Sequence, residues 1–197
     1  MRLTSLIEDM ERFAKEKNVP IMQKEGINYL KQYINTNKIN DILEIGTAVG
    51  YSASMFAKST DEDCIIDTIE IDEERAKEAE ENIKKIGVAE RINIMVGNAV
   101  DILPTLTNAY DIVFIDAAKG KYPIFLENAI RLIKDGGIIL ADNILYKGYV
   151  MSDYNAHKQR TAVRHLREYI KEITENDKCE SEILEIGDGL AITKVRK

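Results

Sequence analysis

The sequence predicts a single α/β domain of the doubly wound, Rossmann-like class. Three observations support this prediction. The chain has 197 residues, which is a usual size for one domain. From residue 41 onward, short apolar runs alternate with longer stretches of helical periodicity, a pattern typical of a mostly parallel sheet. Near the end of the chain, Gly187-Asp188-Gly189 separates two apolar runs, and this turn sequence favours a C-terminal antiparallel hairpin.

The hydrophobic pattern also predicts the individual elements. Two N-terminal helices are expected at residues 3–14 and 24–34, and residues 1–40 are expected to cap the functional site. The expected strands cover residues 41–45, 65–70, 92–96, 111–116, 138–141, 182–186 and 190–195. The expected helices between them cover residues 51–58, 73–86, 99–106, 122–134 and 157–176. Gly87 and Gly136 are placed to end two of these helices.

Composition and charge exclude several classes of protein. The formal net charge is −7, which disfavours a protein that coats nucleic acid by bulk charge but leaves room for a local basic face. Cys64 and Cys179 match no metal-ligand or redox spacing, so we expect reduced thiols. No apolar run approaches the roughly 18 residues that span a bilayer, and no signal peptide is evident. We therefore expect a soluble cytoplasmic protein with no membrane partner.

The first expected strand runs into a glycine-containing turn. Its sequence is Glu44-Ile45-Gly46-Thr47-Ala48-Val49-Gly50-Tyr51-Ser52. Glycine allows the backbone to approach a ligand closely. The dinucleotide fingerprint requires Gly-x-Gly-x-x-Gly, whereas the spacing here is Gly-x-x-x-Gly. The turn therefore favours a nucleoside without phosphates over a phosphate cradle.

A carboxylate ends the second expected strand. Glu70 lies 24 residues after Gly46, and a carboxylate at this place can accept hydrogen bonds from both hydroxyls of a ribose. The turn and the acid together fit either NAD or S-adenosylmethionine (SAM). The missing third glycine favours SAM.

Acidic and amide side chains follow the fourth and fifth expected strands. Asp116 ends one apolar run, and Asp142 and Asn143 follow the next. Carboxyl ends of parallel strands lie on the same edge of a sheet, where ligands bind in open α/β folds. Two carboxylates and an amide oxygen suit a hard cation, and they leave coordination positions for water and substrate. The sequence therefore predicts a Mg²⁺ site.

These motifs resemble a known family. Residues 42–52, the Ile69-Glu70-Ile71-Asp72 run, Asp116-Ala117-Ala118-Lys119 and Asp142-Asn143 are similar to segments of the cation-dependent SAM O-methyltransferases of the caffeoyl-CoA and catechol type. The resemblance extends over essentially the whole chain, from residues 19–22 to residues 187–192. It implies the class I SAM-dependent methyltransferase fold and a homodimer. Within the family the chain looks closest to bacterial tRNA 5-hydroxyuridine methyltransferases.

The resemblance implies a role for each matching residue. Residues expected to contact SAM are Met22, Glu44, Gly46, Thr47, Gly50, Ser52, Glu70, Asn98, Ala99 and Asp116. Asp116, Asp142 and Asn143 are expected to bind the metal, and Lys119 matches the general base, with Asp116 beside it in the catalytic set. Ala117 and Ala118 stand where catechol enzymes carry aromatic or imidazole side chains, so this chain departs from the catechol pattern there.

The methyl acceptor has more than one reading. Residues 144–173 carry six Lys or Arg and three acids, with Tyr146, Tyr149 and Tyr154 among them, and tyrosines can stack on the bases of a tRNA anticodon loop. The resemblance thus favours methylation of wobble 5-hydroxyuridine to 5-methoxyuridine. A small catechol or phenylpropanoid acceptor remains the alternative. An NAD-dependent oxidoreductase and a catalytically silent SAM-binding module are further hypotheses. His157 and His165 are expected to be surface or packing residues.

Overall fold

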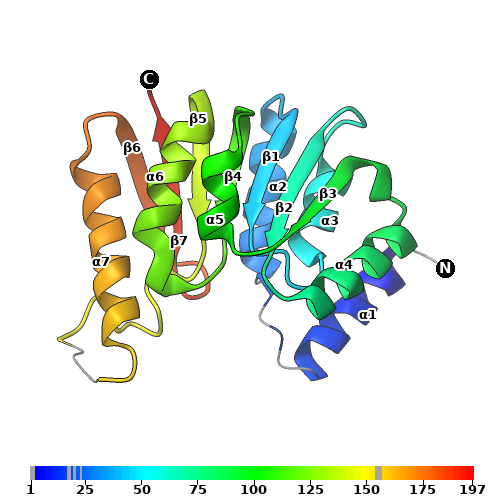
Figure 1. Ribbon diagram of the computed structural model, residues 1–197, viewed down its shortest axis with the longest axis horizontal. Coiled ribbons are helices and arrows are strands. Elements are labelled where there is room, and N and C mark those ends of the chain that lie inside the picture. The colour runs from blue at the N-terminus through cyan, green and yellow to red at the C-terminus, as the bar shows by residue number, and fades with distance from the viewer. Residues whose placement is uncertain (1–2, 17–18, 20, 23, 154–156) are drawn as a thin grey trace. The chain divides into compact units, whose positions relative to one another are not determined.

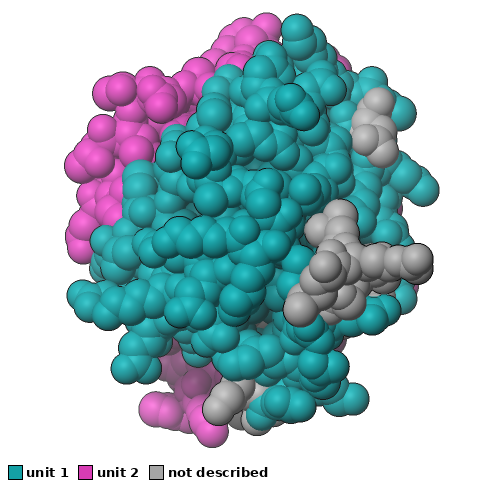
Figure 2. Space-filling model, turned by 90° about the vertical axis from the view of Figure 1, so that its right-hand side faces the viewer, with its two compact units in different colours: residues 1–99 teal, residues 100–197 magenta. Residues whose placement is uncertain are grey.

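The computed structural model describes residues 3–16, 19, 21–22, 24–153 and 157–197 (Figure 1). The internal contacts divide the chain into two compact units, Met1–Ala99 and Val100–Lys197, which are coloured teal and magenta in Figure 2. The expectation of one domain over residues 1–197 stays a prediction. Each unit is described below by itself.

Unit 1 contains a three-stranded parallel sheet with four helices. Its helices are α1 (Leu3–Glu16), α2 (Lys24–Thr36), α3 (Tyr51–Ser59) and α4 (Glu73–Ile86), with the 3₁₀ turn η1 (Ala89–Arg91). Its strands are β1 (Asp41–Ile45), β2 (Ile65–Glu70) and β3 (Ile92–Val96). Strand β2 lies in the middle and pairs in parallel with β1 and with β3. Helices α3 and α4 both contact β2, and α1 contacts α3 and α4.

The unit 1 sequence explains its element boundaries. Ile42, Leu43 and Ile45 of β1 are fully buried, because a parallel strand that is covered on both faces requires a continuous apolar run. Asp72 caps the N-terminus of α4 by accepting hydrogen bonds from two backbone N–H groups of the first turn. Gly87 ends the same helix in the left-handed conformation, as the sequence predicts.

Unit 2 combines parallel and antiparallel strands. Its strands are β4 (Tyr110–Ile115), β5 (Ile133–Ala141), β6 (Cys179–Leu184) and β7 (Leu190–Val195). Its helical segments are η2 (Leu103–Thr105), η3 (Lys119–Lys121), α6 (Tyr122–Leu132) and α7 (Arg160–Glu175), and α5 (Ala99–Ile102) spans the boundary between the units. Strands β4 and β5 are parallel, whereas β7 pairs antiparallel with both β5 and β6. Helices α6 and α7 lie side by side, as seen in Figure 1.

Most of the predicted elements are confirmed, and several boundaries differ; α7 begins at Arg160 rather than residue 157, and β4 lies one residue earlier than expected. The helix expected at residues 99–106 ends at Ile102, and Pro104 lies in the 3₁₀ turn that follows. Gly136 does not end a helix, because α6 already stops at Leu132 and Gly136 lies inside a longer β5. Strand β6 begins at Cys179 rather than residue 182, and its pairing with β7 confirms the predicted hairpin. No helix among the described residues has the length and apolar character needed to cross a membrane.

Candidate active site

The turn after β1 is tied to the end of β2 in unit 1. Gly46 has φ +108°, a conformation that favours glycine, and its N–H donates to the Ile69 carbonyl at 3.0 Å. The Thr47 N–H donates to the same carbonyl at 3.2 Å, and the Ala48 N–H donates to Glu70 Oε2 at 2.8 Å. The Gly46 turn and Glu70 are therefore held together as one structural element.

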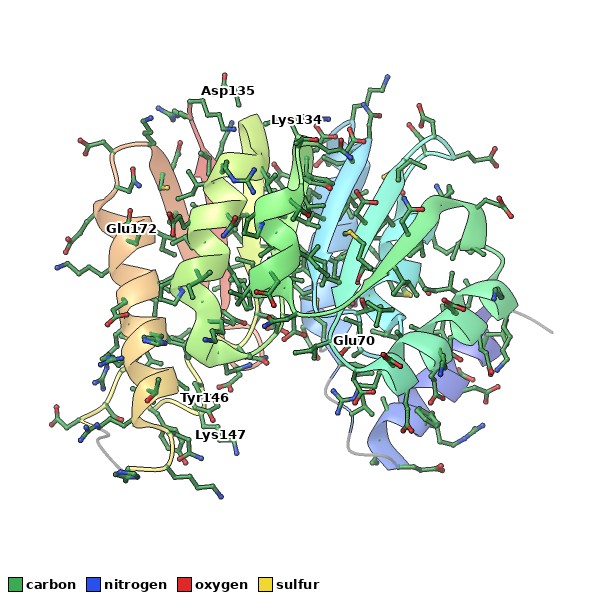
Figure 3. The ribbon with its side chains drawn as sticks, viewed as in Figure 1. Glu70, Lys134, Asp135, Tyr146, Lys147 and Glu172 are labelled. Carbon is green, nitrogen blue, oxygen red and sulfur yellow. The ribbon has the colours of Figure 1, made fainter. Side chains whose placement is uncertain are left out.

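Glu70 lies at the carboxyl end of β2, where Figure 3 labels it, and its side chain is 5% exposed. Its other oxygen, Oε1, accepts a hydrogen bond from the Asp72 N–H at 3.0 Å. A carboxylate oxygen has two lone pairs, so each oxygen of Glu70 can still accept a ligand hydroxyl. The neighbouring Ile71 is 68% exposed, and its apolar side chain could pack against a nucleobase. Sequence reasoning did not single out Ile71, although an isoleucine between two acids at a strand end was a usable signal.

A second carboxylate, Glu44 of β1, is fully buried beneath the turn. Ser52 Oγ donates to Glu44 Oε1, and Thr68 Oγ1 donates to Glu44 Oε2 at 2.5 Å. Thr47 Oγ1 lies 2.6 Å from Thr68 Oγ1. The predicted residues Glu44, Thr47 and Ser52 thus form one network, and Thr68 is the member that the sequence did not reveal. A buried carboxylate supplied with hydroxyl donors fixes the positions of β1, β2 and the start of α3 relative to one another.

Gly50 has a packing reason to be glycine. Its φ is +78°, and a Cβ at this position would lie 3.1 Å from Ile83 Cδ1 and 3.2 Å from Ala79 Cβ on α4. The Asn82 side chain donates to the Val49 carbonyl at 3.0 Å and holds the same part of the turn. These contacts set how closely α4 approaches the start of α3.

The remaining cofactor candidates of unit 1 are Met22, Asn98 and Ala99. Met22 is 4% exposed, and its side chain lies against Gly26 at the start of α2. Asn98 is exposed and Ala99 is half-buried, directly after β3. The Gly97 N–H donates to the Glu70 carbonyl at 2.7 Å, which places Asn98 and Ala99 close to the end of β2.

The predicted metal ligands come together in unit 2. The Asp142 N–H donates to the Ile115 carbonyl at 3.0 Å, so the ends of β4 and β5 are joined at the residues that precede Asp116 and Asn143. Asn143 has φ +56°, which asparagine tolerates better than most residues. Its N–H donates to Asp142 Oδ1 at 2.7 Å.

The two aspartates oppose each other electrostatically. Burial raises the pKa of Asp142 to about 7, and the neighbouring charge of Asp116 adds to this shift. Burial also raises the pKa of Asp116, although the positive charge of Lys119 acts in the opposite direction. Two carboxylates in such surroundings gain stability when a cation lies between them.

Lys119 begins η3, just after β4, and completes this group. Its Nζ donates to Asn143 Oδ1 at 3.1 Å. The same nitrogen lies 6.0 Å from the ring centroid of Tyr122 and 6.0 Å from that of Tyr146, within the range of cation–π attraction. Tyr122 is buried, and its hydroxyl donates to the Asp142 carbonyl at 2.7 Å. The sequence marked Lys119 as the base and Tyr146 as a side chain for base stacking, but it indicated neither the contact between them nor Tyr122.

The donor set fits a hard divalent cation. The group offers two carboxylates and one amide oxygen, which are the ligand types that Mg²⁺ prefers. Within the described ranges, no cluster of three or more His, Cys, Asp or Glu has metal-site geometry. A site with only two such residues and an amide leaves coordination positions for oxygens of water or substrate.

Several basic side chains of residues 144–173 already interact with other groups of the chain. The Arg167 guanidinium donates to the carbonyls of Tyr149, Val150 and Ser152. Arg164 pairs with Glu168 at 3.5 Å, and Lys171 pairs with Glu175 at 3.8 Å. Lys147, Lys158 and Arg160 are exposed.

The aromatic and imidazole side chains of this segment have varied surroundings. The Tyr146 and Tyr149 rings meet edge to face at 5.8 Å, whereas Tyr154 lies outside the described residues. His157 is exposed. His165 Nδ1 lies 2.6 Å from the Gly120 carbonyl oxygen, so His165 links α7 to η3.

The chain is similar to known O-methyltransferases. The model of the O-methyltransferase family matches residues 2–197. A catechol O-methyltransferase of Niastella koreensis is 32% identical over 165 residues, covering 79% of this chain and 73% of the relative. Caffeoyl-CoA O-methyltransferase 1 of Arabidopsis thaliana is 30% identical over 187 residues, covering 90% of this chain and 72% of the relative.

Solved structures extend this likeness to the fold. The O-methyltransferase of Bacillus cereus, crystallised with S-adenosylhomocysteine, has a TM-score of 0.88 at 26% identity and covers 98% of this chain and 91% of its own. The O-methyltransferase TomG of Streptomyces achromogenes, crystallised with SAM, has a TM-score of 0.88 at 25% identity and covers 98% and 90%. The predicted Rossmann-like methyltransferase fold is thus confirmed. The chain belongs to the O-methyltransferase family, and it is a SAM-dependent O-methyltransferase of the caffeoyl-CoA and catechol type.

Proposed function

We propose that the chain methylates one of two adjacent oxygens on an acceptor that Mg²⁺ chelates, and that this acceptor is 5-hydroxyuridine at the wobble position of tRNA. The observation that carries the first part is the group formed by Asp116, Asp142, Asn143 and Lys119 at the ends of β4 and β5. In 5-hydroxyuridine the 5-hydroxyl lies beside the 4-oxo group, and such a pair can chelate a metal as a catechol does.

Unit 1 would bind the methyl donor. Glu70 would accept hydrogen bonds from the ribose hydroxyls while its oxygens keep the Ala48 and Asp72 N–H groups. The Gly46 turn would approach the methionine part, and the Glu44 network would keep Ser52 and Thr47 in place. Met22, Asn98, Ala99 and Gly50 are the further cofactor positions that we propose.

Unit 2 would prepare the acceptor. Asp116, Asp142 and the amide oxygen of Asn143 would hold Mg²⁺, which when bound stabilises the negative charge of an ionised hydroxyl and so lowers the pKa of that hydroxyl. Lys119, at 3.1 Å from Asn143 Oδ1, would accept the hydroxyl proton at Nζ while the amine is neutral. The new oxygen–methyl bond forms as the sulfur–methyl bond breaks, and precise alignment contributes much of the rate.

Two observations support an RNA acceptor. Lys147, Lys158 and Arg160 are exposed in the segment that follows the metal ligands, and exposed cations attract phosphates. Ala117 and Ala118 provide no aromatic side chain directly after Asp116 for a free catechol ring. Arg164 pairs with Glu168, Lys171 pairs with Glu175, and Arg167 contacts backbone carbonyls, so the proposed basic surface of residues 144–173 consists of Lys147, Lys158 and Arg160.

A small catechol or phenylpropanoid acceptor is the second candidate, because the relatives named above carry those activities in their names. Nucleoside mass spectrometry of tRNA from a strain without this gene tests the choice. Loss of 5-methoxyuridine supports the tRNA acceptor. Undiminished 5-methoxyuridine, together with efficient turnover of a free catechol by the purified protein, would overturn it in favour of the small molecule.

A further inference from the structure

The loop after β5 has an unusual backbone. Asn143, Tyr146 and Lys147 all have positive φ, at 56°, 45° and 58°. Tyrosine and lysine gain nothing from this conformation, because their Cβ atoms crowd the neighbouring backbone there. A loop that keeps two adjacent strained residues must be held from outside.

The turn between β6 and β7 holds the loop. The Ile144 N–H donates to the Gly189 carbonyl at 3.0 Å, and the Leu145 N–H donates to the Asp188 carbonyl at 2.9 Å. Asp188 also reaches the strained residues with its side chain, because the Lys147 N–H donates to Asp188 Oδ1 at 2.5 Å. The approach is so close that a Cβ on Gly189 would collide with the Leu145 side chain.

The strained loop places Tyr146 beside Lys119. Figure 3 shows Tyr146 and Lys147 together at the end of unit 2 opposite Asp135. The Tyr146 ring lies 6.0 Å from Lys119 Nζ, and Lys119 in turn donates to Asn143 Oδ1. A change in the backbone conformation at Lys147 would therefore affect the position of the Lys119 amine through the Tyr146 side chain.

The far end of the loop is also held by α7. Arg167 of α7 donates to the Val150 carbonyl at 3.0 Å and to the Tyr149 carbonyl at 3.2 Å. Loss of the Asp188 carboxylate would thus release the residues around Tyr146 and leave the later part of the loop in place.

We propose that Asp188 is a positioning residue for methyl transfer: its carboxylate keeps Tyr146 and Lys147 in the left-handed conformation, and Tyr146 thereby fixes Lys119 Nζ beside Asn143. This role rests on the function proposed above for Lys119. Asp188 touches neither the cofactor nor the acceptor in this proposal, and it acts through the loop. Its charge also raises the pKa of Asp142, and Asp188→Asn separates the two effects because it removes the charge and keeps the accepting oxygen.

The test uses three variants and one fluorescent reporter. Asp188→Ala removes the acceptor of the Lys147 N–H, whereas Asp188→Asn keeps an oxygen that can accept it. Asp135→Ala is the matched control, because Asp135 Oδ1 accepts the Lys197 N–H at 2.8 Å in the same unit but away from Tyr146. The chain contains no tryptophan, so Tyr146→Trp provides a single emission signal at the place in question.

The expected results separate positioning from a loss of folding. With SAM and 3,4-dihydroxybenzoate, or with tRNA that contains 5-hydroxyuridine, Asp188→Ala lowers kcat roughly 10- to 100-fold and leaves KM for SAM unchanged. Asp188→Asn recovers most of this loss. In the Tyr146→Trp background, Asp188→Ala shifts the emission to longer wavelength, whereas Asp188→Asn and Asp135→Ala do not. If Asp188→Ala fails to fold, Asp188→Ser takes its place, because its hydroxyl is too short to reach the Lys147 N–H.

Two results would overturn the proposal. One is an unchanged reporter emission together with an unchanged kcat in Asp188→Ala. The other is an equal loss of kcat in Asp135→Ala, which would indicate a general effect on stability. If the wild-type protein methylates neither acceptor, the proposed function fails, while the emission of the Tyr146→Trp reporter still decides whether Asp188 positions the loop.

Discussion

Glu44 and Glu70 of unit 1 have different electrostatic surroundings from Asp116 and Asp142 of unit 2. Glu44 receives hydroxyl donors from Ser52 and Thr68, and Glu70 receives two backbone N–H groups. Asp116 and Asp142 instead lie close enough for the charge of Asp116 to act on Asp142, and burial raises the pKa of both. The first arrangement is complete without a ligand and suits the orientation of a neutral ribose. The second gains most from an added positive charge, which is why we assign the cation to unit 2.

The largest effect is expected at Asp116. Asp116→Ala removes one metal ligand, and a bound cation contributes several kcal/mol to catalysis, so kcat/KM falls roughly 10³-fold. The fall is measured with saturating SAM across a range of Mg²⁺ concentrations. The exposed Asp101→Ala serves as control and keeps full activity. Full Mg²⁺-dependent activity in Asp116→Ala would remove the distinction between the two units.

Lys119 is expected to have the next largest effect. Lys119→Met removes the proposed base but keeps an unbranched side chain, and kcat falls about 10²-fold, at the lower end for general base catalysis because the metal also lowers the pKa of the acceptor hydroxyl. SAM affinity measured by calorimetry stays unchanged. The exposed neighbour Lys121 gives the control variant Lys121→Met. Equal losses in both variants would indicate that general positive charge, rather than a base at this position, matters.

Glu70→Ala tests whether unit 1 binds SAM. Glu70→Ala removes the ribose acceptor and the partner of the Ala48 N–H, and a hydrogen bond to a charged group contributes about 1.5–3 kcal/mol, so the Kd for SAM rises roughly 10- to 100-fold. Calorimetry with SAM measures this change, and calorimetry with Mn²⁺ shows cation binding as in the wild type. Glu74→Ala, an exposed position in the first turn of α4, keeps the wild-type Kd. A Glu70→Ala protein that binds SAM normally contradicts the assignment of unit 1.

A separate effect concerns stability in the absence of metal. The pKa of Asp142 is raised to about 7 by burial and by Asp116. A carboxyl group with a raised pKa destabilises the fold as pH rises from the unfolded value of about 4 through the folded value, because the charged form is then enforced. Asp142→Asn therefore stabilises the metal-free protein by about 4 kcal/mol at pH 8 and by little at pH 4, as measured by urea unfolding. An equal effect at both values would assign the change to packing.

The sequence predicted the backbone better than it predicted side-chain partners. The bounds of β1, β2, β3 and α4 follow from continuous apolar runs and from the caps Asp72 and Gly87, which are local signals. The helix at residue 99 ended early because Pro104 and the η2 turn interrupt it. These features depend on residues that are neighbours in the chain, so they can be predicted from the sequence.

The residues of the candidate site also fall into those that a local signal predicts and those that it does not. Glu70, Asp116, Lys119, Asp142 and Asn143 were marked because they stand at strand ends, and the structure brings the last four together. Thr68, Tyr122, Tyr146 and Asp188 were not marked for these contacts. Their contacts join residues far apart in the chain, such as Lys147 with Asp188, and no local pattern encodes such a pair.

The central claim is that Asp116, Asp142 and Asn143 hold the cation that the acceptor chelates. The most direct measurement is methyl transfer from labelled SAM by protein dialysed against EDTA, with tRNA containing 5-hydroxyuridine and with 3,4-dihydroxybenzoate, before and after Mg²⁺ is added back. We expect no transfer after dialysis, and recovery with Mg²⁺ in the wild type but not in Asp116→Ala. Transfer that continues undiminished in EDTA would rule out this cation site.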